Sequence, residues 1–327
     1  MIQKETVRKI AEQLLRNLWR TSSTGLYNGK AGLSLSLFIA SEYLQDDTIE
    51  EAAYKLFQES LIVRSSDIGF ENGLAGIGYT LLYLVENKYL EADFDEIFGM
   101  QYETLIRSFE NIEKDPLRLV NSLQVIYFLS KVCSIKKEDD RIEKIIKKIF
   151  EGLELFLTVQ FQDFVDIHYI NRKADVLNVY QTYLKLIDYS GYSHFSHALL
   201  EDYAALYRKG KIVSSLEAGF YLCRIAERYN IKEYEDVINE NINNGINNIY
   251  VCTLSLKERI DLAKIIDAIG GKDIKGQDLL PDIEDLQKEK ALQDLLTTVD
   301  ERSFPFGYGG GLGRFLIYCI NKNTELL

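Results

Sequence analysis

Histidine is scarce in this chain, and one of its three copies stands two residues after an aspartate. Asp166 and His168 lie in the segment Phe-Val-Asp-Ile-His-Tyr. A carboxylate beside an imidazole orients the ring and raises its basicity, so this pair is a candidate acid–base couple. A structural hydrogen bond in a loop would explain the same two residues. For His194 and His197, on a polar segment, we expect ordinary hydrogen bonds at the surface or between helices.

The four cysteines are far apart in the sequence and form no Cys-x-x-Cys pair. Such spacing is typical of free thiols in a reducing compartment rather than of a disulfide framework. Three of them follow apolar stretches, so we expect buried thiols. The four residues are Cys133, Cys223, Cys252 and Cys319.

Two carboxylates precede a glycine-rich helix start, at Asp67 and Glu71. A pair of carboxylates can hydrolyse a glycosidic bond, one as the acid and the other as the base or nucleophile. Glu71 stands directly before Asn72-Gly73, where an acidic residue also stabilises the first turn of a helix. Carbohydrate-active enzymes usually surround their acids with tryptophans, and this chain has one, Trp19. The single tryptophan argues against a sugar substrate.

The formal net charge is -12, from 38 basic and 50 acidic residues. A surface of that balance repels polyphosphate, so we expect neither nucleic acid nor an anionic membrane as a partner. No run of about 18 apolar residues is present, and the first twenty residues alternate charged with apolar types. We therefore expect a cytoplasmic protein.

Apolar residues recur at three- and four-residue spacing almost throughout, which predicts an all-α fold. The helical segments are of two alternating kinds. The amphipathic segments, each with a wide polar face, are 3–20, 47–64, 93–112, 138–158, 232–247 and 279–298. The segments that are apolar nearly all round are 30–44, 73–87, 117–132, 174–189, 213–228, 255–268 and 310–322.

This alternation predicts a layer of half-exposed helices around a layer of buried ones. A double-layered α/α toroid of about seven hairpins has that arrangement, and so does an open two-layer solenoid. Only three prolines occur, and no Ser/Gly/Pro-rich linker divides the chain. We expect a single domain over residues 1–327.

A glycine signature opens three of the apolar helices, in 26–33, 70–77 and 308–314. Each copy contains Gly-x-x-Gly, in which we expect the first glycine to allow a turn closed to other residues. We expect the second to let a neighbouring helix approach closely. The spacing from Gly29 through Gly73 to Gly310 accommodates seven repeats. The last copy is nearly as good as the first, which favours a closed ring over a capped solenoid. We do not predict a phosphate-binding loop here, because the strand and the Lys-Ser/Thr of a P-loop are both absent from these segments.

Seven predicted hairpins and the Asn-Gly-x-Ala-Gly helix starts together resemble the lanthionine synthetase C-like (LanC-like) family. The resemblance is most specific at 28–37, 72–82 and 307–317. It implies an α/α toroid. It also implies a role in ribosomally made peptides, where family members close thioether rings by adding a cysteine thiol to a dehydrated serine or threonine. In such members a zinc ion held by two cysteines and a histidine activates the substrate thiol.

Matched to the family's ligand positions, this chain keeps one ligand of three. Cys252 matches the second cysteine, Ser214 stands in place of the first, and Thr253 stands in place of the histidine. Catalytic zinc requires about three protein ligands, so the resemblance implies a member without most of its metal site. Asp115 falls near an aspartate that precedes the family's third inner helix. Asp115-Pro116 equally fits a helix start with proline at its first position.

We therefore predict a LanC-like protein of lanthipeptide-type modification that lacks zinc-dependent cyclase activity. It would bind a precursor peptide or a peptide-modifying enzyme in the ring cavity, and we expect no cofactor. One alternative is an active cyclase in which Cys252 and unrecognised residues assemble a different metal site. The other is a carbohydrate-active enzyme on an α/α toroid that uses Asp67 and Glu71.

Overall fold

The computed structural model describes residues 2–62, 67–110, 123–165, 170–270, 278–282, 285–300 and 303–320. Within these ranges every regular element is a helix, which confirms the predicted all-α class. None of the described helices is long and apolar enough to cross a membrane.

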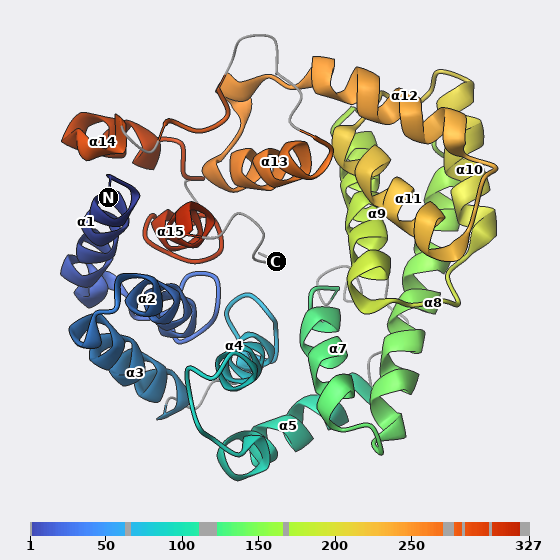
Figure 1. Cartoon of the computed structure of the whole chain (residues 1–327). Helices are drawn as coiled ribbons and strands as arrows, with labels where there is room; N and C mark the ends of the chain where they lie inside the picture. Colours follow the sequence, from blue (N-terminus) through green and yellow to red (C-terminus); the bar gives the residue numbers. More distant parts are fainter. Residues whose placement is uncertain are drawn as a thin grey trace. The chain divides into compact units, whose positions relative to one another are not determined.

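The helices follow one another in hairpins along the described chain (Figure 1), and we call the first helix of each hairpin outer and the second inner, as in the predicted α/α toroid. The outer helices are α1 (Ile2–Arg16), α3 (Asp47–Ile62), α5 (Phe94–Glu110), α8 (Asp140–Gln162), α10 (His197–Arg208), α12 (Glu235–Gly245) and α14 (Glu289–Leu296). The inner helices are α2 (Lys30–Leu44), α4 (Leu74–Glu86), α7 (Val125–Ile135), α9 (Ile170–Ser190), α11 (Leu216–Tyr229), α13 (Leu256–Ala268) and α15 (Leu312–Ile320). Short 3-10 turns are η1 (Leu18–Arg20), η2 (Ile246–Asn248), η3 (Val251–Thr253) and η4 (Asp285–Gln287).

The chain divides into two compact units. Unit 1 comprises Met1–Arg107, Tyr250–Gly271 and Gln277–Leu327, and unit 2 comprises Ser108–Ile249 and Lys272–Gly276. The single domain expected from the sequence stays a prediction. Unit 1 contains the first hairpins and the last one, so the joint that matters for ring closure lies inside it.

The loops that lead into α2, α4 and α15 share one hydrogen-bonding scheme. In each loop the first helical residue donates its amide to the carbonyl seven residues earlier. The pairs are Lys30 to Ser23 at 3.0 Å, Leu74 to Asp67 at 2.8 Å and Leu312 to Pro305 at 2.8 Å. The residue before each helix is therefore the same structural position in all three copies, and it is Gly29, Gly73 and Gly311.

This register differs by one residue from the one expected for the last copy, which paired Gly310 with Gly29. The sequence comparison aligned Gly-x-x-Gly, whereas the three loops share a glycine four residues before the helix-start glycine. These earlier glycines are Gly25, Gly69 and Gly307. Gly310 is one residue out of that register.

The helix-start glycines are required by space and not by backbone conformation. Gly29 has φ -130° and Gly73 has φ -114°, values that any residue adopts. A Cβ atom on Gly29 would lie 2.5 Å from the carbonyl oxygen of Gly25, and one on Gly73 would lie 2.6 Å from the Gly69 nitrogen. The turn is closed to other residues, as expected, and the reason is a lack of space, because the loop folds back against these positions.

The next glycines, Gly32 and Gly76, lie against the preceding repeat, as expected for a close approach. A Cβ on Gly76 would be 2.8 Å from Cβ of Leu26, in the loop before α2. A Cβ on Gly32 would be 2.6 Å from Cβ of Tyr308, in the loop before α15. Leu26 and Tyr308 are equivalent positions in the common register. The last repeat thus packs on the first as the first packs on the second.

Backbone hydrogen bonds repeat the same relationship. The Tyr27 amide donates to the carbonyl of Glu71 at 2.6 Å, and the Gly309 amide donates to the carbonyl of Tyr27 at 2.9 Å. Tyr27, Glu71 and Gly309 are again equivalent positions. In Figure 1, α15 lies beside α1 and α2, which it contacts. The hairpin that contains α15 is thus joined to the first hairpin inside unit 1.

Arg314 occupies the position of Gly32 and Gly76 in the last repeat, and its side chain is fully buried. Its Nη2 atom lies 2.5 Å from Oδ1 of Asp261 on α13, the inner helix of the preceding hairpin. Lys257 pairs with the other oxygen of Asp261 at 3.1 Å. Gly32 and Gly76 each contact the neighbouring repeat through an apolar side chain. At the equivalent position of the last repeat, Arg314 contacts the preceding hairpin through an ion pair.

The inner helices are not equally buried. In α2, nearly every residue is buried, whereas in α13 the buried residues are Leu256, Ile260, Ile265 and Ile266. The expectation that 255–268 is apolar all round was wrong, because the helix also carries charged side chains such as Arg259 and Asp261.

Candidate functional site

Cys252 lies in an open hollow of about 600 Å³ at the start of α13. Its side chain is exposed, and η3 places it between the buried Val251 and the exposed Thr253. The prediction of four buried thiols was therefore wrong for Cys252, since a single 3-10 turn leaves this residue on the solvent side. Cys319 is buried, and Cys133 and Cys223 are partly exposed. Burial raises the pKa of the Cys133 and Cys223 thiols.

The wall of this hollow is fixed by how α13 begins. Ser255 caps the helix by accepting from the amide of Glu258, and Oε2 of Glu258 accepts from the Ser255 amide at 2.8 Å. The amide of Leu256 donates to the carbonyl of Thr298 at 2.8 Å, which ties the helix start to the turn after α14. These bonds satisfy orphan amides of the helix end and hold the opposite walls together.

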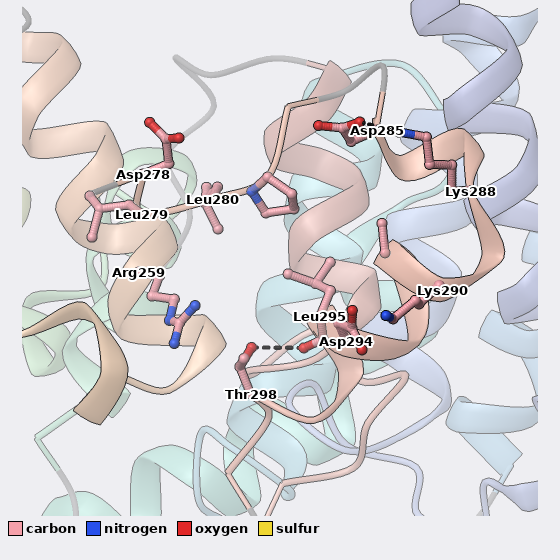
Figure 2. A pocket seen from close by; sticks show the side chains of 12 residues that line it. Arg259, Asp278, Leu279, Leu280, Asp285, Lys288, Lys290, Asp294, Leu295 and Thr298 are labelled. Carbon is pink, nitrogen blue, oxygen red and sulfur yellow. Dashed lines mark hydrogen bonds and ion pairs between the residues drawn. The ribbon is translucent and has the colours of Figure 1, made fainter. Parts of the chain in front are cut away.

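A second hollow of about 590 Å³ adjoins the first, since Arg259 and Thr298 line both. Figure 2 shows it between the start of α13, the segment 278–281, and the turn η4 with α14. We call the two hollows together the α13 cleft. Its second part is lined by Arg259, Asp278, Leu279, Leu280, Pro281, Asp285, Lys288, Lys290, Ala291, Asp294, Leu295 and Thr298.

The two residues expected in place of zinc ligands make hydrogen bonds of their own. The Thr253 hydroxyl donates to the carbonyl of Tyr250 at 2.8 Å. In unit 2, the hydroxyls of Ser214 and Tyr207 share a hydrogen bond of 2.7 Å. Ser214 immediately precedes Ser215, whose side chain caps α11. Each residue thus has a local structural role.

The donor set does not fit zinc in the part of the chain that the structure describes. No three His, Cys, Asp or Glu side chains of these residues are placed to hold a metal ion together. In the α13 cleft, Cys252 is the candidate sulfur ligand. The carboxylate of Glu258, in the same lining, accepts hydrogen bonds from the amide and hydroxyl of Ser255. Asp115, Asp166 and His168 lie outside the described residues. The proposed acid–base couple and the candidate Asp115 therefore stay predictions.

The remaining candidates are placed as follows. His194 precedes α10 and His197 is its first residue, and both are exposed. Their rings contact Tyr192 and Phe195 respectively.

Asp67 and Glu71 both lie in the loop before α4. The carboxylate of Asp67 accepts from the Gly69 amide at 2.7 Å and so closes a turn. Glu71 contributes its carbonyl to the joint with Tyr27. These are structural roles, and the use of the two carboxylates on a sugar stays a hypothesis.

A comparison with known families finds a match in the first third of the chain. The family model described as lanthionine synthetase C-like protein matches residues 2–118. Residues 2–118 are thus similar to the lanthionine synthetase C-like family. A search among curated proteins gives no significant match.

The matched stretch contains the loops before α2 and α4. The loop before α15 lies far outside that stretch, yet it repeats their hydrogen bonds. Sequence reasoning missed two residues of this region, Arg314 and Arg259. Arg314 would have been found by aligning the glycine pairs four residues apart. Arg259 is preceded by a visible capping box, Ser255-x-x-Glu258, but no local signal places it between two hollows.

Proposed function

We propose that this LanC-like protein binds a peptide, or an enzyme that modifies one, and does not carry out zinc-dependent thioether formation. The family match supports a place in lanthionine-type peptide chemistry. What speaks against the reaction is the chemistry of the residues at the ligand positions, Ser214, Cys252 and Thr253. Zinc prefers thiolate and imidazole, and a neutral hydroxyl is a poor substitute for either.

The observation that carries the proposal is the α13 cleft beside Cys252. It is open, it is lined by residues from the segments 252–259 and 278–300, and it combines polar walls with apolar side chains. Binding sites for peptides and small molecules have this mixed lining. The cleft would thus place a bound peptide next to Cys252, which is followed by Thr253 where the family has a histidine.

A metal and thiol assay tests this proposal. The purified chain is analysed for zinc, and a synthetic peptide that contains dehydroalanine and cysteine is incubated with it while free thiol is titrated. We expect zinc far below one equivalent and a thiol loss no faster than in buffer. Cys252→Ser is the control variant and should behave as the parent does.

The exposed thiol of Cys252 supports a second candidate, a cyclase with a different metal site. Stoichiometric zinc that disappears in Cys252→Ser, together with thiol loss catalysed by the parent alone, would replace the proposed function by this one. In the cyclase case zinc would supply an activated thiolate, and Cys252 would be one of its ligands.

A further inference from the structure

We infer that the α13 cleft takes an extended peptide segment with an acidic side chain, and that Arg259 holds the carboxylate of that side chain. The inference rests on the proposed function and adds to it the place and the chemical class of the ligand.

Arg259 stands where the two hollows of the cleft meet. Its Nε donates to the carbonyl of Leu254 at 3.0 Å, which orients the guanidinium, and its two terminal nitrogens have no hydrogen-bond partner among the described residues. Arg259 makes no ion pair with the residues that the structure describes. A planar, oriented guanidinium with free terminal donors is suited to a carboxylate ligand.

Carboxylates also line the cleft, and in the part of the chain that the structure describes none of them pairs with Arg259. Glu258 is held by the amide and hydroxyl of Ser255, at 2.8 and 2.7 Å. Asp285 pairs with Lys288 at 2.8 Å. Besides Arg259, the second hollow is lined by Lys288 and Lys290 and by the carboxylates of Asp278, Asp285 and Asp294 (Figure 2). The positive charge for a ligand carboxylate therefore comes from the guanidinium of Arg259 and not from a positively charged lining.

Three threonines along the cleft are prepared to accept hydrogen bonds. The hydroxyls of Thr253, Thr297 and Thr298 donate to the carbonyls of Tyr250, Asp294 and Leu295 at 2.8, 2.6 and 2.7 Å. Because each hydroxyl proton is engaged, each oxygen keeps its lone pairs for an incoming donor. Backbone amides of an extended segment are such donors, and they require no particular sequence.

The second half of the cleft offers apolar surface beside the guanidinium. Leu279 and Leu295 are buried, and Pro281 and Ala291 are partly exposed. An apolar side chain next to the acidic one would be covered there. The expected ligand is therefore a short extended segment in which an acidic residue adjoins an apolar one.

A library selection followed by binding measurements tests the inference. The full immobilised chain selects from a phage-displayed library of random nonapeptides. Synthetic copies of an enriched peptide, blocked at both ends, then carry either its acidic residue or the matching amide. A third copy has the amide and a free carboxyl terminus. Fluorescence anisotropy compares the parent chain with Arg259→Gln, Arg259→Lys and Arg16→Gln, an exposed cation of α1 outside the cleft.

We expect acidic residues to be enriched and the amide copy to bind about tenfold more weakly to the parent chain and to Arg16→Gln. In Arg259→Gln the two copies should bind alike, and Arg259→Lys should keep part of the difference because it keeps charge without the planar fork. Should Arg259→Gln not fold, the difference in binding between the acidic and amide copies is compared between Arg259→Lys and the parent chain, and a smaller difference in Arg259→Lys supports the inference.

Equal binding of both copies to the parent chain, or a preference for the acidic copy that survives in Arg259→Gln, overturns the inference and leaves peptide binding standing. Full recovery by the free carboxyl terminus overturns the side-chain assignment. If the library yields no sequence enriched over blank support, it is the proposed function itself that fails.

Discussion

Arg314 on α15 and Asp261 on α13 form an ion pair in which Nη2 lies 2.5 Å from Oδ1, and the arginine side chain is fully buried. The arginine occupies a position that is glycine in two other repeats. At those glycines the neighbouring repeat packs closely, whereas at Arg314 a charged side chain lies between the two helices. A buried charge is tolerated when a partner of opposite sign is held against it.

Removing the carboxylate should therefore be costly. We expect Asp261→Asn to lower the free energy of unfolding by about 3 kcal/mol, the lower end for a broken buried pair because Asp261 is itself partly exposed. The same change in an Arg314→Met background should cost much less. Urea unfolding of the two single variants and the double variant measures the coupling, and additive losses would refute a direct interaction.

The glycines of the repeated loop give a second prediction, with a built-in control. Gly76→Ala should destabilise the protein by about 3 kcal/mol, because its Cβ would overlap the Phe70 carbonyl and crowd Leu26. Gly99, in α5, has 4.0 Å to its nearest neighbours. Gly99→Ala should stabilise by about 0.5 to 1 kcal/mol, since alanine is the better helix former. Thermal unfolding distinguishes the two, and equal effects would mean that the repeats are not in close contact.

Glu154 in unit 2 gives a prediction about pH. Burial raises the pKa of Glu154, although the Tyr183 hydroxyl and the Ser196 amide, at 2.7 and 2.9 Å from its Oε1, oppose that shift. The folded state therefore binds the proton more tightly than the unfolded state, for which the pKa is about 4.5. The stability linked to this proton is present below that pH and is lost as pH rises through the folded pKa.

Glu154→Gln keeps the accepting oxygen and cannot ionise. Its free energy of unfolding should rise relative to the parent as pH increases from about 4.5 toward neutrality. Urea unfolding across that range measures the difference, and Glu143→Gln, an exposed acid on the same helix, is the control. A difference that stays constant with pH would show that burial does not raise the pKa of Glu154.

Asn241 gives the fourth prediction. Its fully buried amide oxygen accepts from the Tyr203 hydroxyl at 3.2 Å and from the Ser215 amide at 2.9 Å. Asn241→Ala leaves both donors without this acceptor and should cost about 3 kcal/mol. The exposed Asn247 on the following turn is the matched control, and Asn247→Ala should change stability by less than about 0.5 kcal/mol. Similar losses in chemical denaturation would contradict the network.

The fold was largely predictable because its signals are local. The bounds of α2, 30–44, follow directly from the apolar run after Gly29, and the pairing of outer with inner helices follows from which faces are polar. The register of the last repeat was missed by one residue, because a run of three glycines satisfies several alignments and only the loop's hydrogen bonds select Gly311.

The α13 cleft could not be predicted in the same way. Its walls come from Cys252, Arg259 and the turn at Thr298, which are joined by contacts between segments more than thirty residues apart. Periodicity carries no information about such contacts. The resemblance drew attention to Cys252 but gave no reason to look at Arg259, whose importance lies in where it stands and not in its neighbours in sequence.

The two equivalent hydrogen bonds, from the Gly309 amide to Tyr27 and from the Tyr27 amide to Glu71, have a consequence for where the polypeptide can be opened. The joint between the last and first repeats has the same kinds of contact as the joint between the first and second. In addition, the side-chain amide of Gln3 donates to the carbonyl of Cys319 at 2.7 Å. A circular permutant with these ends linked and new termini at Gly210, whose φ is +66° and which has open space around it, should keep every helix pair described above.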